Sequence, residues 1–226
     1  MRLSFRGCLV NRGTTSIASM LACLVVFPTL PAAELVMRDL QADMLVLPTN
    51  FDFTLDTPNF TRSGSDSFDA GTALELGGRY SFSRVGDPFG LVVGLDATTQ
   101  AYSYDSEDFL FAYGARASLG AGYALTDSWA LTTEFGAAFG WTDLSLPESG
   151  SNQGFSADGD YRAFDLRLAA HYTISRRMLI SLQVGYLSQT HDLTTDQGDD
   201  LELEVAGVFV GVGMTWRFSN APERVE

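Results

Sequence analysis

Residues 208–218, Val208-Phe209-Val210-Gly211-Val212-Gly213-Met214-Thr215-Trp216-Arg217-Phe218, alternate between two kinds of side chain. The even positions are all large and apolar, whereas the odd positions hold glycine, threonine, arginine and a single phenylalanine. Successive side chains of a β-strand point to opposite faces of a sheet. The segment therefore predicts a strand with one continuous apolar face.

The same two-residue period recurs in seven segments upstream, at residues 45–55, 74–82, 89–100, 109–123, 129–141, 164–172 and 180–186. The first is the weakest because Pro48 interrupts it, and proline is confined to strand ends and edges. Short connections at 84–88, 126–128 and 175–177 alternate with longer or more polar ones at 56–67, 105–108, 146–160 and 192–200. This order predicts eight antiparallel up-and-down strands within residues 44–218.

Composition agrees with an all-β protein and excludes several classes. The chain has 226 residues, 46% of them apolar, so intrinsic disorder is not expected. Its 16 Phe, 8 Tyr, 3 Trp and 22 Gly are a mixture typical of β-proteins. A net charge of −14 argues against nucleic-acid binding, which requires a basic surface to neutralise phosphates.

The first 33 residues are predicted to be a secretory signal peptide. Arg2, Arg6 and Arg12 precede the apolar stretch 17–27, and small residues follow at Ala32 and Ala33. The apolar stretch is shorter than the roughly 20 residues that a membrane helix needs. We expect residues 34–43 to be an N-terminal periplasmic segment, 44–218 the barrel and 219–226 a C-terminal tail.

Both cysteines, Cys8 and Cys23, fall within the predicted signal peptide. Lipoprotein processing at Cys23 stays open as an alternative. Residues 34–226 contain no cysteine, so a disulfide or thiolate chemistry is not expected in the mature chain.

Charged side chains occupy the middle of the less apolar strand faces. They are Asp52, Glu75, Arg79, Asp96, Arg116, Glu134, Asp165, Arg167 and Arg217, with His171 on the same face. Isolated ions are costly to bury, so we expect these groups to form an ion-pair network inside a narrow lumen. A conductive path through the same charges is the alternative.

Aromatic residues recur at both ends of the apolar faces. Phe82, Phe89, Tyr123, Trp129, Tyr172 and Trp216 lie near the short connections, and Phe68, Phe109, Phe111, Trp141, Phe164 and Tyr186 lie toward the long ones. Two aromatic girdles around an aliphatic band are typical of a membrane barrel, whose strands must close into a ring. A soluble lipocalin or jelly roll is the alternative fold.

The alternating strands from Met44 to Phe218 resemble the small eight-stranded outer-membrane barrels of the OmpA-like, OmpX-like and OmpW-like group. The resemblance implies a monomer in the outer membrane of a Gram-negative-type envelope, surrounded by lipid and lipopolysaccharide, with no cofactor. The end of the last strand, Trp216 and Phe218, resembles the signal read by the barrel-assembly machinery. The chain departs from this pattern because residues 219–226 follow Phe218.

The resemblance also implies that the long connections face the outside of the cell. They are rich in acids, namely Asp105, Glu107, Asp108, Glu148, Asp158, Asp160, Asp192, Asp196, Asp199, Asp200, Glu202 and Glu204. We therefore expect a structural or surface-interaction role, since exposed loops commonly carry binding. Divalent-cation binding at these loops is the alternative, because hard cations prefer carboxylates, although no defined metal-binding motif is present.

Two alternatives to that role are a narrow porin-like channel and, with less support, a lipid A-modifying enzyme. His171-Tyr172-Thr173 resembles the His-x-Ser element of lipid A deacylases, but threonine replaces serine. His191, the second of two histidines, lacks an evident triad. We therefore do not expect an enzyme.

Overall fold

The structure, a computed structural model, describes residues 39–82, 88–104, 108–146 and 155–218. These residues form ten strands: β1 (Asp39–Val46), β2 (Asn50–Asp56), β3 (Thr61–Ser67), β4 (Ala70–Phe82), β5 (Phe89–Tyr104), β6 (Asp108–Ala124), β7 (Trp129–Leu146), β8 (Phe155–Ser175), β9 (Met178–Thr195) and β10 (Asp200–Arg217). The predicted signal peptide and C-terminal tail lie outside the described residues. The described part contains no helix that is long and apolar enough to cross a membrane.

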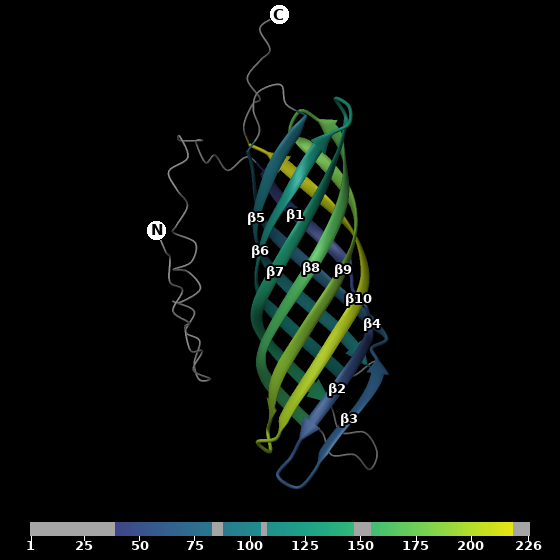
Figure 1. Cartoon of the computed structure of the whole chain (residues 1–226), viewed down its shortest axis with the longest axis vertical. Helices are drawn as coiled ribbons and strands as arrows, with labels where there is room; N and C mark the ends of the chain where they lie inside the picture. Colours follow the sequence, from purple (N-terminus) through teal and green to yellow (C-terminus); the bar gives the residue numbers. More distant parts are fainter. Residues whose placement is uncertain (1–38, 83–87, 105–107, 147–154, 219–226) are drawn as a thin grey trace, which may run out of the picture. The chain divides into compact units, whose positions relative to one another are not determined.

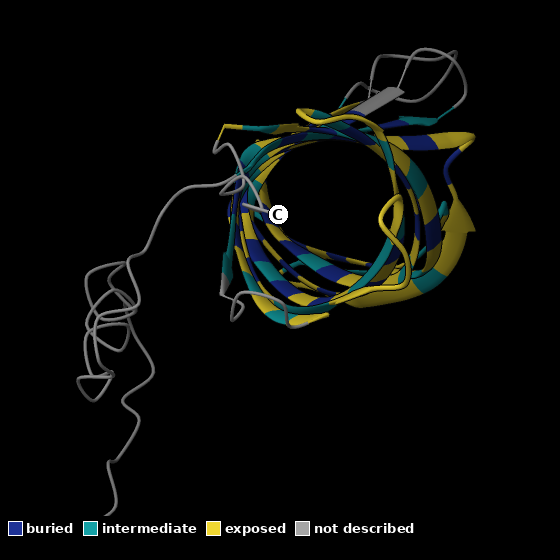
Figure 2. Ribbon diagram, turned by 90° about the horizontal axis from the view of Figure 1, so that it is seen from above, coloured by how far each residue is buried: buried dark blue, intermediate teal, exposed yellow. Residues whose placement is uncertain are grey.

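Eight of the strands close into a ring. Strands β4 to β10 are paired in sequence order, and β1 joins β4 on one side to β10 on the other, with every pairing antiparallel. The strands are tilted around a common axis (Figure 1), and a view along that axis shows the closed wall (Figure 2). The predicted eight-stranded up-and-down barrel is confirmed.

The first predicted strand is wrong in its bounds. Instead of one strand over 45–55, β1 begins at Asp39 and ends before Pro48, and β2 follows as a separate strand. Val46 pairs with Val210 of β10, and Phe51 pairs with Val205 further along the same strand. Proline cannot donate to a ladder, so the chain leaves the ring there and forms the β2–β3 hairpin beside β10. Residues 39–43, expected to precede the barrel, belong to β1.

The strands are also longer than expected at the end where the long connections lie, which we call the long-connection end. Parts of the connections predicted at 146–160 and 192–200 are strand, because β8 starts at Phe155, β9 reaches Thr195 and β10 starts at Asp200. Residues 147–154 lie outside the described residues. A tilted strand needs about 9–11 residues to cross a membrane. With 18 residues in β9 and 21 in β8, the wall continues well beyond that length.

The outward surface changes from apolar to polar along β7, β8, β9 and β10. In β9, Leu182, Val184 and Tyr186 are exposed, and beyond them Ser188 and Asp192 face outward. The change from Phe164 to Arg162 in β8 lies at the same level. The band nearer the short connections is therefore suited to hydrocarbon, and the wall at the long-connection end is suited to water.

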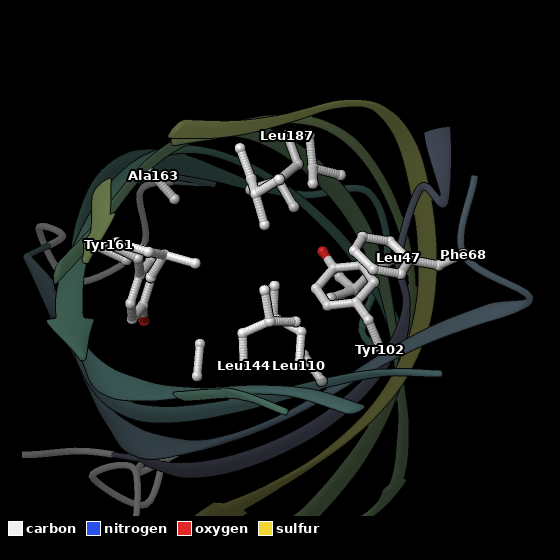
Figure 3. Packing of buried hydrophobic residues seen from close by; sticks show 14 of the residues in the cluster. Leu47, Phe68, Tyr102, Leu110, Leu144, Tyr161, Ala163 and Leu187 are labelled. Atoms are coloured by element: carbon white, nitrogen blue, oxygen red, sulfur yellow. The ribbon is translucent and has the colours of Figure 1, made fainter. Parts of the chain in front are cut away.

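The inward surface changes in the opposite sense. Charged side chains fill the part of the interior behind the apolar band, whereas an apolar cluster fills the part behind the polar wall. Leu47, Phe68, Tyr102, Leu110, Leu144, Tyr161, Ala163 and Leu187 of this cluster point into the barrel (Figure 3). Apolar groups are buried inward where the surrounding solvent is water, so this end is built like a soluble β-barrel.

Candidate functional site

Arg116 of β6 lies at the centre of the charged interior. Its Nε and Nη2 donate to the two oxygens of Asp165 at 2.8 and 2.7 Å, and its Nη1 donates to Asp96 Oδ2 at 3.2 Å. The carboxylate of Glu134 lies 3.7 Å from the same Nη1. With a relative exposure of 1%, Arg116 joins carboxylates from β5, β7 and β8.

Arg167 of β8 reaches across the interior to β4. Its Nη1 and Nη2 donate to the carboxylate of Glu75 at 2.8 and 3.2 Å, and Asp43 Oδ2 lies 3.7 Å from Nη1. Its Nε lies 3.5 Å from Asp165, which links this pair to Arg116. The guanidinium also stacks over Phe209 with 5.2 Å to the ring centroid, a cation–π contact.

Arg79 of β4 completes the network toward the short-connection end, where the connections between strands are short. It donates through Nη1 to Asp96, and its Nε lies 3.5 Å from Glu134. Gly94 provides the room, because a Cβ at that position would meet the Arg79 guanidinium and Ser118. Gly136 does the same beside Arg116 and Asp165. The glycines on the inner face therefore allow long charged side chains to fill the narrow lumen.

The prediction for Asp52 is wrong. Asp52 lies in β2, is exposed, and pairs with Glu204 on the outer face of the hairpin. Its expected place in the lumen is taken by Asp43, which is 4% exposed and accepts a hydrogen bond from Gln41 at 2.7 Å. The cause is the break at Pro48, because β1 is the strand that lines the lumen.

Two further residues expected in the network lie at its edge. The ring of His171 is 2.9 Å from Thr132 Oγ1 and makes no ion pair in the described part of the chain. Arg217 ends β10, where its Nε lies 3.5 Å from Asp39 and its side chain is 37% exposed. Glu75, Arg79, Asp96, Arg116, Glu134, Asp165 and Arg167 are the expected residues that the fold brings together.

The aromatic residues of the expected girdles mostly face outward. Phe89, Tyr123, Trp129, Trp141, Tyr172, Tyr186 and Trp216 are all exposed on the outer surface. Trp129 contacts Tyr172 at one end of the band, with ring centroids 4.9 Å apart, and Tyr113 stacks on Trp141 at the other, at 6.0 Å. Phe68 differs, because it is buried in the apolar cluster and stacks on Phe51. Phe82 ends β4, and its side chain lies outside the described part.

The apolar cluster lines a partly open cavity of about 260 Å³ at the long-connection end. Its walls are Phe51, Phe53, Leu55, Phe68, Leu110, Leu144, Phe155, Leu201 and Leu203, with Asp66 and Tyr104 at one side. Tyr104 donates its hydroxyl to Asp66 Oδ2 at 2.9 Å, which connects β5 to β3. The β2–β3 hairpin thus closes one wall of an aromatic-lined cavity.

Buried polar side chains also lie among the residues of the apolar cluster. Gln189 Nε2 donates to the Tyr102 hydroxyl at 2.6 Å, and the Nδ1 of His191 lies 2.8 Å from Thr142 Oγ1. His191 lies beyond the apolar outer band, level with exposed Asp192, and burial lowers its pKa to about 4. His191 is therefore neutral at pH 7 and links β9 to β7 by its hydrogen bond.

Sequence reasoning did not identify the apolar interior at the long-connection end. Its signal is present in Leu201-Glu202-Leu203-Glu204-Val205, where the odd positions are apolar, whereas the even positions are apolar from Val208 onward. Even positions point outward and odd positions inward along the whole of β10. The move of the apolar residues from odd to even positions therefore marks a change of the solvent around the wall, from water to lipid. No group of three or more His, Cys, Asp or Glu side chains is placed to hold a metal ion within the described ranges.

Comparison with known proteins identifies the fold. No protein-family profile and no curated protein sequence match the chain. The outer membrane protein OprG from Pseudomonas aeruginosa is similar in structure, with a TM-score of 0.50 and 12% identity over 80% of this chain and 96% of OprG. Ail of Yersinia pestis aligns with a TM-score of 0.38 and 14% identity over 80% of this chain and all of Ail. Neisserial surface protein A aligns with a TM-score of 0.44 and 12% identity over 81% of this chain and 98% of its own.

The closed ring, the outward apolar band and the similarity to OprG agree. The chain has the fold of an outer-membrane β-barrel, and its outward apolar band is suited to contact with lipid.

Proposed function

We propose that this protein is a sealed outer-membrane scaffold that presents an acidic, folded module to the outside of the cell for surface interactions. The observation that carries this proposal is the exchange of polarity along the strands. The same wall that is apolar outside and charged inside becomes polar outside and apolar inside toward the long-connection end. Such an end is stable in water, so the long-connection end is the one that projects from the membrane.

The projecting wall is strongly acidic. Asp52, Asp143, Asp158, Asp160, Asp192, Glu202 and Glu204 are exposed on its outer surface. Arg162 forms an ion pair with one of them, Asp192, at 3.4 Å. Electrostatic complementarity steers association, so a partner with a basic surface fits this wall.

The orientation is tested by labelling intact cells. Residues 34–226 contain no cysteine, so single cysteines can be introduced at exposed Asp192 and Ser175, which lie at opposite ends. A membrane-impermeant maleimide is expected to label Asp192→Cys on intact cells and Ser175→Cys only after the outer membrane is permeabilised. The reverse pattern would refute the proposed orientation.

The acidic wall is tested separately with the purified barrel. Oligolysine is the probe, and its binding is expected to weaken as salt rises and to fall in the variant carrying Asp192→Asn, Glu202→Asn and Glu204→Asn. Equal binding by this variant and the wild type would contradict a role for the wall.

The narrow channel is less well supported, because eight charged side chains cross-link the lumen within the apolar band. Planar-bilayer recordings of the purified barrel are expected to show no steady ion current. A reproducible unitary conductance would favour the channel instead. We also propose that the protein is not an enzyme, and unchanged lipopolysaccharide acyl chains by mass spectrometry after incubation would agree.

One observation favours a second candidate function. The aromatic-lined cavity has the few polar groups and apolar walls that small-molecule sites commonly have. Its volume of about 260 Å³ suits a small apolar molecule. Binding of 1-aminonaphthalene, followed by its fluorescence, is expected in the wild type and lost in Leu203→Trp, which fills the cavity. Equal fluorescence in the two proteins would exclude this site.

A further inference from the structure

A long apolar groove of about 760 Å³ crosses the outer surface of the lipid-facing band. It follows two neighbouring rows of outward side chains that register places side by side from strand to strand. One row is Thr99, Leu74, Met44, Val212, Leu182 and Ala170, and the other is Ala97, Leu76, Ala42, Met214, Ile180, Tyr172 and Trp129. The groove therefore runs across the strands along their hydrogen-bonding direction.

The groove exists because small and large residues are neighbours in these rows. Ala42, Ala97 and Ala170 leave low points in the surface. Leu74, at 59% exposure, and Leu182, at 68%, stand above them as walls. Adjacent strands lie about 4.8 Å apart, so the six steps from β5 to β7 through β1 give a run of roughly 29 Å.

The surroundings decide what fills the groove. It lies within the band that faces hydrocarbon and is continuous with it, so its occupant must be apolar and elongated. Half of a bilayer core is about 15 Å thick, which is the reach of one acyl chain. The groove is thus long enough to hold an acyl chain along its length, oblique to the membrane normal because the strands are tilted.

One end of the groove indicates which leaflet supplies the lipid. Trp129, Tyr172 and Trp216 line the groove beside the short-connection end. Trp and Tyr rings prefer the level of the lipid headgroups. In the orientation proposed above, this end faces the periplasmic leaflet.

We propose that this groove is a binding site for one acyl chain of a phospholipid from the periplasmic leaflet, with its headgroup beside Trp129, Tyr172 and Trp216. The alanines form the floor of the groove against which the acyl chain packs. A larger side chain at any of these positions would displace the acyl chain from the barrel wall. The site opens on the outer surface, and the inward residues Glu75, Asp43, Gly213 and Ser181, which lie between the two rows, also line it. It shares no lining residue with the aromatic-lined cavity.

Native mass spectrometry of the full-length mature barrel, extracted in mild detergent, tests this proposal. The wild type is expected to retain one phospholipid. Ala170→Leu and Ala42→Leu fill the groove and are expected to lower the retained fraction roughly tenfold, because van der Waals contacts with the chain are lost. The control is Ala137→Leu, an outward position paired with Ala117 and Phe164, outside the groove. Its retained lipid is expected to be unchanged.

Folding of each variant is verified by its heat-dependent mobility in SDS gels. No retained phospholipid in the folded wild type would overturn the proposal, as would an equal loss in Ala137→Leu. Retained lipopolysaccharide in place of phospholipid would show that the wrong leaflet is assigned, and a dimer of barrels would show that a second copy occupies the groove. Either result overturns the proposal without bearing on the surface role of the acidic wall.

Discussion

Replacing Arg116 with methionine removes the central cation of the charged lumen while keeping a long side chain. In the wild type, Arg116 makes two hydrogen bonds with Asp165 and one with Asp96, and lies 3.7 Å from Glu134. The variant leaves three buried carboxylates with fewer partners. We expect the free energy of unfolding to fall sharply.

The magnitude follows from burial. The side chains of Arg116, Asp96 and Asp165 are 2%, 1% and 5% exposed, so water compensates little for a lost partner. Removing one member of a buried ion pair costs about 3–5 kcal/mol. The effect of Arg116→Met is expected at the upper end of that range, because Asp165 loses both of its short contacts to this guanidinium.

Arg162→Met is the matched control. Arg162 also pairs with an aspartate, at 3.4 Å from Asp192, but its side chain is 63% exposed. Exposed pairs contribute about 0–1 kcal/mol. The free energies of unfolding are measured by urea titration of the barrels in lipid vesicles, with tryptophan fluorescence as the signal.

Equal losses of stability in the two arginine variants would show that burial does not determine the cost of removing these cations. A double variant, Arg116→Met with Asp165→Leu, gives an internal test, because it removes both charges of the bidentate pair. Its loss is expected to be about 1–2 kcal/mol smaller than that of Arg116→Met alone. A fully additive loss would show that the pair is not coupled.

Three further predictions use the same unfolding assay. Asp43→Asn is expected to raise the free energy of unfolding by up to about 1 kcal/mol, because five carboxylates face three guanidinium groups in the lumen and Asp43 lies directly opposite Glu75. The control Asp52→Asn, on the exposed hairpin, is expected to change the free energy of unfolding by less. A lower stability of Asp43→Asn would contradict an excess of negative charge in the lumen. Leu193→Ala is expected to cost about 2–5 kcal/mol because Leu193 is buried in the apolar cluster at 2% exposure, and a negligible loss would argue against a packed core there. Burial lowers the pKa of His191 to about 4, below about 6.5 in the unfolded chain. The contribution of His191 to the free energy of unfolding is therefore complete above pH 7 and is lost as the pH falls toward 4. His191→Gln is expected to flatten this part of the plot of stability against pH, and an unchanged plot would refute the prediction.

The sequence was sufficient to predict the ring and the direction of most side chains within the band. The alternation in Val208 to Phe218 assigned the outer and inner faces of β10 correctly, and the same parity placed Arg116, Asp165 and Arg167 inside. A two-residue period survives any tilt or curvature of the sheet, so it predicts facing without knowledge of the register. Which charges pair across the lumen depends on the register and was not predictable.

The errors arise where local pattern and solvent change together. Pro48 marked a strand end, but the sequence could not show whether the residues before or after it line the lumen, so Asp52 was assigned in place of Asp43. Acids such as Asp192 and Glu204 suggested loops, because an outward polar residue was not expected on a strand whose other half faces lipid. The strands continue into water, where the inner residues become apolar instead.

We expect lipid to cover the outer surface up to Tyr186 in β9 and water to cover it beyond. Nitroxide labels on single cysteines at Leu182, Val184, Ser188 and Asp192, all outward in β9, test it in reconstituted vesicles. Collision rates with dissolved oxygen and with a water-soluble nickel chelate report contact with lipid and with water. We predict oxygen-dominated collisions at Leu182 and Val184 and nickel-dominated collisions at Ser188 and Asp192. Nickel-dominated collisions at all four positions would show that water, and not lipid, covers the apolar band of β9.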